Sequence, residues 1–396
     1  MKIAHVTTVA ASLRMLLANQ MCSLREAGFE VVGISSPTSL AENREVAGAR
    51  HIAVPISRNL TPFADLLSLF RLWRVMRRER FTIVHTHTPK AGLLGQLAAR
   101  LAGVPLIVNT VHGFYFHENM RPMARRFYIL MEKVAALCSD RILSQNAEDV
   151  ETAVREGICS REKITVLGNG IDLARFDSAS VPADELARLR SRYDLPAGAP
   201  VVGFVGRLAA KRKGFADFLA AAREIAAAQP ECRFLIVGEA DHGKSDAMQP
   251  SAAADFGIAE RCIFAGFRPN EELPAFYKLM SVLVLPSTFE GVPRAVMEAA
   301  AMGVPAVATD VKGNREAIEV ETTGLLVPLG DVPALSAAIL RILEDHELAA
   351  RMSREARRMA AQRFDEQHVF AKVKSEYARL IAQKEIAAIA ACSQTT

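Results

Sequence analysis

The chain has 396 residues, of which 50% are hydrophobic and 23% are charged, and its formal net charge is +4. This length suits two domains, and this composition is ordinary for a soluble globular protein. The sequence contains no run of 18 apolar residues, the length needed to span a membrane. Its first residues also lack the apolar core of a signal peptide, so we expect a cytoplasmic protein. The six cysteines show no C-x-x-C spacing, which argues against a disulfide framework or a zinc site.

The positive charge is concentrated in the first half of the chain. Residues 1–180 contain 22 Lys and Arg against 16 Asp and Glu, and residues 58–133 contain 12 against 4. This asymmetry predicts that one face of the first half meets an anionic partner.

Short apolar runs alternate with helical patterns in both halves, which predicts parallel sheets with helices on both faces. The runs in the first half are Ile3–Val6, Val31–Ile34, Ile83–His87, Leu106–Val111, Ile142–Ser144 and Ile164–Leu167. Those in the second half are Val201–Gly206, Phe234–Gly238, Cys262–Ala265, Val282–Leu285, Ala306–Ala308 and Leu325–Val327. We expect domains at 1–180 and 181–364, a hinge region at 177–198, and a terminal helix at about 365–385.

Two predicted helices, within 63–80 and 120–138, carry most of the basic residues of region 63–133, interspersed with apolar side chains. Docking on an anionic membrane would explain this pattern, at about 1 kcal/mol per well-placed basic residue. The alternative is that each apolar stripe packs on the sheet and each charged face is solvated. No recognised nucleic-acid module or aromatic-basic interleaving is present, so we expect no nucleic-acid partner.

His112 directly follows the strand predicted at 106–111 and precedes Gly113, which places it at the carboxyl end of that strand. His85 and His87, two positions apart on another predicted strand, could share a face with it. No carboxylate or cysteine stands at ligand spacing beside these histidines, so we expect no metal site.

Gly206 and Arg207 follow the strand predicted at 201–206, and Lys213 precedes a helical run. The guanidinium of Arg207 offers a fork of donors and Lys213 a mobile ammonium, a pair suited to two phosphates.

The segment Gly238–Ser245 satisfies the P-loop pattern G-x-x-x-x-G-K-[ST] and follows a predicted strand. A P-loop needs a helix that opens at Lys244, but Pro250 interrupts the residues that follow. Glu239 and Asp241 would also repel a triphosphate. We therefore expect a false match, and keep a P-loop nucleotide hydrolase only as a rival function.

The apolar runs at 282–285 and 306–308 flank a loop and a helix of about ten residues between Pro293 and Gly303. In open parallel sheets, ligands bind at the carboxyl ends of strands, where Glu290 and the loop after it would lie. The start of the helix favours an anion, whereas Glu290 and Glu298 would accept hydrogen bonds from hydroxyl groups. A sugar attached to a phosphate satisfies both requirements.

With Glu290 and Glu298 eight positions apart, this stretch resembles the E-x7-E motif of the retaining glycosyltransferases of family 4. Other matches in order and approximate spacing are His112-Gly113-Phe114, Asn169-Gly170-Ile171-Asp172 and Gly206-Arg207 with Lys213-Gly214. The resemblance implies the GT-B fold, an α/β architecture of two Rossmann-like domains facing across a cleft. It also implies that the C-terminal helix crosses back to the first domain.

The resemblance assigns the donor to the E-x7-E stretch. Glu298 would hold the ribose hydroxyls of a nucleotide-sugar. Glu290, with the backbone of Gly291 and Val292, would hold the sugar. Whether the reaction proceeds by a front-face mechanism or through a covalent intermediate on Glu290 stays open.

The remaining motifs are assigned to the reacting phosphate by the same resemblance. Arg207 and Lys213 would bind the donor diphosphate and stabilise it as it leaves, so we expect no metal or other cofactor. His112 would contact the donor sugar or its phosphate, and Gly206 and Gly238 would line the donor pocket.

Residues 85–103 resemble the capsular-polysaccharide and O-antigen branch of the family, which also lacks a Gly-Gly loop after the first strand, as Thr7–Leu13 does here. The resemblance implies transfer of a hexose or N-acetylhexosamine from a UDP-sugar to a polyprenyl-diphosphate-linked acceptor at the inner face of the plasma membrane. Lys90 is a candidate ligand for the acceptor phosphate. A UDP-sugar epimerase of the same fold is the alternative, but it needs additional acid and base carboxylates that the sequence does not offer. A further alternative is a non-catalytic nucleotide-sugar sensor, which would bind the donor without turning it over.

Overall fold

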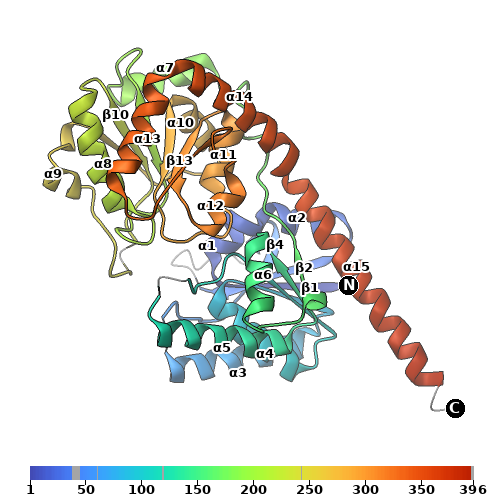
Figure 1. The fold of residues 1–396 in the computed structure, drawn as a ribbon. Helices are drawn as coiled ribbons and strands as arrows, with labels where there is room; N and C mark the ends of the chain where they lie inside the picture. The colour runs from blue at the N-terminus through green and yellow to red at the C-terminus, as the bar shows by residue number, and fades with distance from the viewer. Residues whose placement is uncertain (38–44, 60, 118–119, 242, 394–396) are drawn as a thin grey trace. The chain divides into compact units, whose positions relative to one another are not determined.

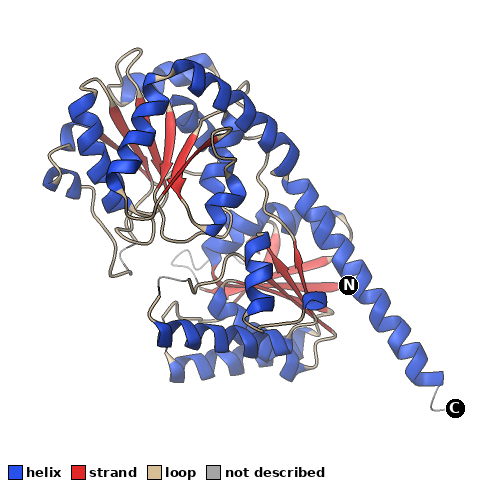
Figure 2. Ribbon diagram, in the orientation of Figure 1, coloured by secondary structure: helices blue, strands red, loops and turns tan. Residues whose placement is uncertain are grey.

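The computed structural model describes residues 1–37, 45–59, 61–117, 120–241 and 243–393. The chain divides into two compact units, the first formed by Met1–Gly168 with Gln367–Thr396 and the second by Asn169–Glu366. Each unit is built on one predominantly parallel sheet with helices packed against it (Figure 1, Figure 2). This is the α/β architecture expected from the alternating sequence pattern.

Among its described residues, the sheet of the first unit has eight strands in the order β3-β4-β2-β1-β5-β6-β7-β8. The strands are β1 Lys2–Val9, β2 Glu30–Ser36, β3 Glu45–Val46, β4 Ala49–Ala53, β5 Ile83–His87, β6 Leu106–Val111, β7 Arg141–Ser144 and β8 Ile164–Val166. All neighbours are parallel except β3 and β4. The register of β1 with β5 sets His5 opposite His85, which builds part of the histidine cluster described below.

The helices of the first unit cover both faces of its sheet. They are α1 Ala10–Ser12, a π-helical turn Leu13–Leu17, α2 Ala18–Glu26, α3 Pro62–Glu79, α4 Pro89–Ala102, α5 Pro122–Cys138, α6 Ala147–Arg155 and α15 Glu366–Ser393. On one face α4 lies between α3 and α5 (Figure 1). On the other, Val373, Tyr377 and Leu380 of α15 join the core beneath β1, β5 and β6. The terminal helix therefore returns to the first unit, as predicted.

The sheet of the second unit has six parallel strands in the part of the chain that the structure describes, in the order β11-β10-β9-β12-β13-β14. The strands are β9 Val201–Val205, β10 Arg233–Val237, β11 Cys262–Gly266, β12 Val282–Leu285, β13 Ala306–Thr309 and β14 Gly324–Val327. The helices are α7 Ala183–Arg192, α8 Phe215–Ala228, α9 Ala252–Asp255, α10 Leu273–Leu279, α11 Arg294–Met302, α12 Lys312–Ala317, α13 Val332–Glu344 and α14 His346–Arg363. The strands contribute alternate residues to two apolar cores, one on each face.

The boundary between the units falls earlier than the expected position after residue 180. Ile171 and Phe176 are buried in the core of the second unit, and the Ile171 N–H donates to the Phe364 carbonyl at 2.8 Å. The segment expected to be a hinge, 177–198, instead contains α7, which packs against α10 inside the second unit. Its mixed polar sequence reflects an exposed helix and its flanking turns.

Across the part of the chain that the structure describes, no helix combines the length and the apolar character needed to cross a membrane.

Candidate functional site

The loop between β12 and α11 carries Glu290, the first glutamate of the E-x7-E stretch, and α11 carries the second, Glu298. All four residues of β12 are buried, so the strand ends where the polar loop begins. Pro293 precedes the first turn of α11, and Gly303 ends the helix at φ +75°, a conformation that favours glycine. The predicted helix is confirmed, and it starts one residue after Pro293. Glu290 therefore lies at the carboxyl end of a buried parallel strand.

Lys213 reaches Glu290 from a neighbouring turn. Gly214 has φ +65°, and a Cβ atom at this position would lie 1.8 Å from the Pro286 carbonyl oxygen. The turn can therefore approach the end of β12 only with glycine. The Lys213 Nζ atom lies 2.6 Å from Glu290 Oε1, and the two side chains are 20% and 12% exposed. Two residues that the sequence assigned to the donor thus form an ion pair.

Glu298 lies in the middle of α11 and is 4% exposed. Its Oε2 accepts a hydrogen bond from the Tyr277 hydroxyl at 2.8 Å, and its Oε1 lies 3.4 Å from Arg294 Nε. Burial, followed by the negative charge of Glu298, holds the pKa of Tyr277 well above its usual value, so the phenol stays a donor. A carboxylate has about four lone-pair sites, so Glu298 keeps acceptor capacity for a ligand. Tyr277 was not identified from the sequence, because a tyrosine in an apolar helix is typical of a core residue.

Gly206 and Gly238 stand at the ends of β9 and β10, with φ values of +154° and +138°. A Cβ atom at Gly238 would lie 1.9 Å from the Gly206 carbonyl oxygen, so the two turns touch. Arg207, in the first of these turns, has its Nη1 atom 2.9 Å from Asp241 Oδ2 in the second. The structure therefore brings Gly206, Gly238 and Arg207 together.

In its described residues, 238–241 and 243–245, the P-loop-like segment does not have P-loop geometry. Residues 243–251 form turns and extended backbone, so no helix opens at Lys244. Asp241 is engaged with Arg207. The false match expected from the sequence agrees with this local structure.

The loop backbone at Gly291 and Val292 is fixed by contacts from two other segments. The Asn169 side-chain amide donates to the Val292 carbonyl at 2.9 Å. A Cβ atom at Gly313, in α12, would lie 2.2 Å from the Gly291 carbonyl oxygen. Asn169 belongs to the second motif noted in the sequence, so part of that motif supports the Glu290 loop.

His112 lies in the first unit, at the end of β6, within a chain of imidazoles. His87 Nδ1 is 3.1 Å from His112 Nε2, and His87 Nε2 is 3.0 Å from His5 Nδ1. Burial lowers the pKa of both His5 and His112 to about 4, although a hydrogen bond to Gln145 partly offsets the effect on His112. These rings are therefore neutral at pH 7. The shared face of His87 and His112 was predicted; the contribution of His5 was not, because a single histidine in a first strand carries no distinctive spacing.

Three histidines of this cluster form a candidate metal site. Ring nitrogens of His5, His85 and His87 lie within 4.8 Å of one another. The nitrogens of His85, however, already contact the Tyr377 hydroxyl at 2.5 Å and Thr110 Oγ1 at 2.7 Å. Hydrogen bonding thus accounts for most of the ring nitrogens, and the expectation of a metal-independent protein stays a prediction.

Lys90, at the start of α4, already has protein partners. Its Nζ atom lies 2.5 Å from Asp65 Oδ1 and 3.4 Å from Thr61 Oγ1. This arrangement joins α4 to the start of α3. A contact with an acceptor phosphate would have to compete with Asp65.

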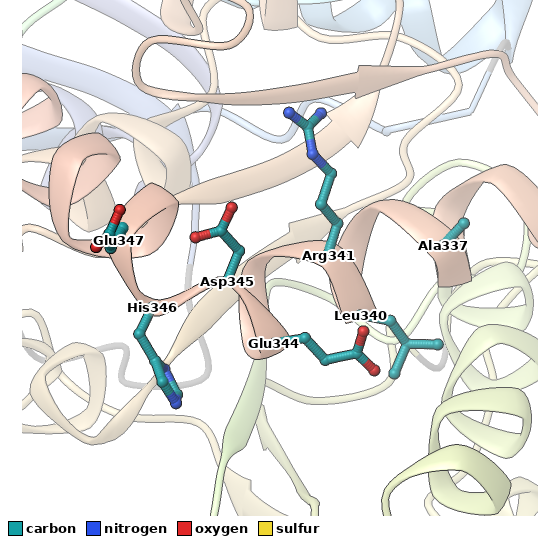
Figure 3. A pocket seen from close by; sticks show the side chains of 7 residues that line it. All are labelled: Ala337, Leu340, Arg341, Glu344, Asp345, His346 and Glu347. Carbon is teal, nitrogen blue, oxygen red and sulfur yellow. The ribbon is translucent and has the colours of Figure 1, made fainter.

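A surface hollow at the junction of α13 and α14 contains none of the motif residues (Figure 3). Its Arg341 is bound in a bidentate manner by Glu321, with N–O distances of 2.6 and 2.7 Å. Asp345 caps α14 through the Leu348 N–H. These side chains stabilise the helix junction, so we do not assign the hollow to function.

Comparison with known proteins agrees with this arrangement. Residues 14–170 match the family described as "Glycosyl transferase 4-like domain", and residues 199–345 match "Glycosyl transferases group 1". The chain is 32% identical to the UDP-Gal:alpha-D-GlcNAc-diphosphoundecaprenol alpha-1,3-galactosyltransferase of Escherichia coli, over 83% of each protein. It is 27% identical to the capsular polysaccharide biosynthesis glycosyltransferase CapM of Staphylococcus aureus, over 97% of this chain and 98% of the relative.

Solved structures share the fold at lower sequence identity. Sucrose-phosphate synthase from Thermosynechococcus elongatus has a TM-score of 0.81 at 22% identity, covering 97% of this chain and 100% of the other. HepE of Anabaena, in complex with UDP and glucose, has a TM-score of 0.80 at 19% identity, covering 96% and 100%. A UDP-N-acetylglucosamine 2-epimerase of Listeria monocytogenes, described as putative, has a TM-score of 0.65 at 16% identity, covering 96% and 97%. Taken with the sequence relatives, these likenesses identify the chain as a glycosyltransferase of family 4 with the GT-B fold.

Proposed function

We propose that this glycosyltransferase transfers a hexose or N-acetylhexosamine, with retention, from a UDP-sugar to a polyprenyl-diphosphate-linked glycan in cell-surface polysaccharide synthesis. The observation that carries the proposal is the pairing of Lys213 with Glu290 at the end of β12. It joins a cation suited to phosphate and a carboxylate suited to sugar hydroxyls in one place. The E. coli relative is named for UDP-galactose and a diphosphoundecaprenol acceptor, which supports both substrate classes.

The donor is assigned to the second unit. Glu298, buried and oriented by Tyr277, would accept the ribose hydroxyls through its remaining lone pairs. Glu290 and the loop backbone at Gly291 and Val292 would bind the sugar. Gly206 and Gly238 would allow the donor to approach the strand ends closely, since neither carries a side chain there.

Arg207 and Lys213 would neutralise the diphosphate as it leaves, which makes a divalent metal unnecessary. In a front-face reaction the bond from the anomeric carbon to the phosphate oxygen breaks, and a bond to the acceptor oxygen forms on the same face. The acceptor proton passes to the departing phosphate oxygen. Because the ammonium of Lys213 stabilises the carboxylate of Glu290, it makes Glu290 a weaker nucleophile. This favours the front-face route over a covalent intermediate on Glu290.

The membrane side of the proposal rests on the helical layer of the first unit in which α4 lies between α3 and α5 (Figure 1). Phe63 and Leu66 of α3 are 94% and 67% exposed, and Met123 of α5 is 83% exposed. Exposed arginines, among them Arg74 and Arg77, follow on the same helices. Apolar side chains beside basic ones suit peripheral binding to an anionic membrane that carries the acceptor.

The experiment that tests the donor assignment is calorimetric titration of the purified protein with UDP, GDP, ADP and ATP, with and without Mg²⁺. We expect UDP to bind without metal and Glu298→Ala to lose that binding. Lys244→Ala, in the P-loop-like segment, serves as the matched control and should bind UDP as the wild type does. Binding of ATP with Mg²⁺ alone, unaffected by Glu298→Ala, would contradict the proposal.

A further inference from the structure

A small polar pocket lies in the first unit, between the start of α4, the end of β6 and the middle of α5. Its polar lining includes Gln96, Asn109, His112 and Glu132. Its volume of about 20 Å³ is room for one water-sized group. Gly92 and Gln96 lie in the stretch 85–103 and His112 in the His-Gly-Phe motif, but the resemblance assigns no role to Gly92, Gln96 or Glu132.

Gln96 directs an unpaired donor toward this space. Its side chain is 1% exposed, and its Oε1 accepts a hydrogen bond from the Ser139 hydroxyl, which fixes the orientation of the amide. Its Nε2 has no hydrogen-bond partner among the described residues. A buried donor without a partner costs about 1–3 kcal/mol, so such groups are usually satisfied by a water or a ligand.

Gly92 keeps the space beside that donor open. A Cβ atom at Gly92 would lie 3.6 Å from Gln96 Nε2 and 3.4 Å from Asn109 Oδ1. These distances are ordinary contacts, so an alanine would fit without moving the backbone. It would occupy the gap between the two amides.

The charges around the pocket select the kind of group that can enter. Asp149, near Glu132, is buried and accepts hydrogen bonds from the Phe114 N–H at 3.2 Å and from the Asn146 amide at 3.1 Å. Burial, followed by the charge of Asp149, raises the pKa of Glu132 to about 7. Of the described lining residues none is Lys or Arg, and His112 is neutral. Carboxyl and amide groups of this kind suit a neutral hydroxyl, which can both donate and accept, better than an anionic group.

We propose that this pocket is a subsite for one hydroxyl group of the acceptor sugar, which accepts from the Gln96 amide and donates to the Glu132 carboxyl beside His112. The proposal rests on the proposed function in one respect, that the acceptor is a sugar. It adds Gln96, Glu132 and Gly92 as residues that determine which acceptor is used.

The test is direct binding of a defined probe, measured by calorimetry without any donor. The probe is N-acetylglucosamine joined through an α-diphosphate to a decyl chain, together with its 3-, 4- and 6-deoxy forms. We expect one deoxy form to bind the wild type about 3- to 10-fold more weakly than the full probe, the range of one neutral hydrogen bond. Gly92→Ala and Gln96→Leu should each weaken the full probe and abolish its advantage over that deoxy form.

Two variants distinguish a specific loss of binding from a general loss of folding. Gly92→Ala replaces a helical glycine by a better helix former, so it should melt at or above the wild-type temperature. Gln20→Leu is the matched control for Gln96→Leu, because Gln20 is also buried with an unpaired Nε2 but lies in α2, away from the pocket. It should bind all four probes as the wild type does.

Three results would overturn the subsite: no probe binds the wild type, no deoxy form is discriminated, or Gly92→Ala discriminates the probes as the wild type does. The last result would leave the pocket as the site of a bound water. Failure of the proposed function would be seen separately, as absent UDP binding in the second unit and absent transfer.

Discussion

At the scale of single residues, the cations assigned to the donor diphosphate are each paired with a carboxylate. Lys213 contacts Glu290, and Arg207 contacts Asp241. Glu290 has a proposed role of its own in binding the sugar, whereas Asp241 has none. Asp241 therefore competes with the diphosphate for Arg207, and it adds a negative charge where the ligand would bring more.

We expect Asp241→Asn to bind UDP about 2- to 5-fold more tightly than the wild type. The estimate follows from the 42% exposure of Arg207, since exposed ion pairs contribute about 0–1 kcal/mol. Calorimetry at low and high salt measures the effect, which should shrink as salt rises. Asp310→Asn, which removes another partly exposed ion pair of the same unit, is the control and should leave the affinity unchanged. Weaker binding by Asp241→Asn would instead mean that Asp241 holds Arg207 in its binding position.

Glu132 gives a pH dependence of stability whose direction can be worked out. Its pKa is about 7 in the folded protein against an ordinary value of 4.5, so the folded state holds the proton more tightly. The free energy of unfolding therefore falls as pH rises from about 4.5 to about 7, and it stays lower above that range. The loss from this one group is on the order of 3 kcal/mol at most.

Glu132→Gln should remove this component of the pH dependence. Urea unfolding at pH 5 and pH 8 measures the free energy of unfolding of both proteins. The difference, variant minus wild type, should be more positive at pH 8 than at pH 5. Glu151→Gln, at a carboxylate 67% exposed on α6, is the control and should follow the wild-type profile. Parallel curves for Glu132→Gln and the wild type would show that Glu132 titrates normally.

At the scale of elements, the turn before α8 depends on a close contact that only glycine permits. Gly214 has φ +65°, and a Cβ atom there would lie 1.8 Å from the Pro286 carbonyl oxygen. Gly198 has a similar φ of +77° but no atom within 4 Å of an added Cβ. Gly198→Ala should therefore lose only about 1–2 kcal/mol through backbone strain. Gly214→Ala should lose about 3 kcal/mol or more, and should also weaken UDP binding by displacing Lys213. Equal losses of stability in urea titrations of the two variants would contradict this contact.

The terminal helix α15 is held on the first unit by a buried polar contact as well as by apolar packing. The Tyr377 side chain is fully buried, and its hydroxyl lies 2.5 Å from His85 Nδ1. Tyr377→Phe leaves a buried imidazole nitrogen without a partner, so we expect a loss of about 1–3 kcal/mol in unfolding free energy. Arg379→Gln, at a residue 40% exposed on the same helix, should stay within about 0.5 kcal/mol of the wild type. An unchanged free energy of unfolding in Tyr377→Phe would show that His85 finds another hydrogen-bond partner.

Most strands could be predicted because buried parallel strands are short continuous apolar runs, as at 234–237 and 282–285. The strands β3 and β4 were missed because they are short, lie at the sheet edge, and include Arg50 and His51. The pairing of Lys213 with Glu290 could not be derived from spacing, because it depends on the approach of Gly214 to Pro286. Tyr277, Gln96 and Glu132 carried no signal, since their roles arise only from neighbours distant in sequence.

At the scale of the whole molecule, each unit holds a different part of the proposed chemistry. The second unit contains the carboxylates and cations assigned to the nucleotide-sugar. The first contains the histidine chain, the polar pocket and the basic helices. The terminal helix α15 returns the end of the chain to the first unit, whose core it joins. The family and the fold are recognised from both units together. The proposals for donor binding and acceptor binding can be tested separately, each on its own unit.

The last prediction concerns the outer surface of α3 as a whole. Phe63, Leu66 and Phe70 follow helical spacing with Arg74 and Arg77, opposite the buried side of the helix. Reversing both arginines, Arg74→Glu with Arg77→Glu, should lower partitioning onto phosphatidylglycerol vesicles by at least about 30-fold, at about 1 kcal/mol per basic residue. The difference should shrink at high salt and be small on neutral vesicles.

A matched pair of substitutions in the second unit separates a local membrane surface from a general effect of charge. Arg351→Glu with Arg354→Glu, on exposed positions of α14, changes the net charge by the same amount. This control should partition like the wild type, because α14 lies outside the proposed membrane surface. Phe63→Ser with Leu66→Ser should weaken binding at every salt concentration, since burial of apolar side chains is not screened. If the two charge reversals reduce sedimentation with vesicles equally, the attraction belongs to net charge, and α3 is simply a solvated helix.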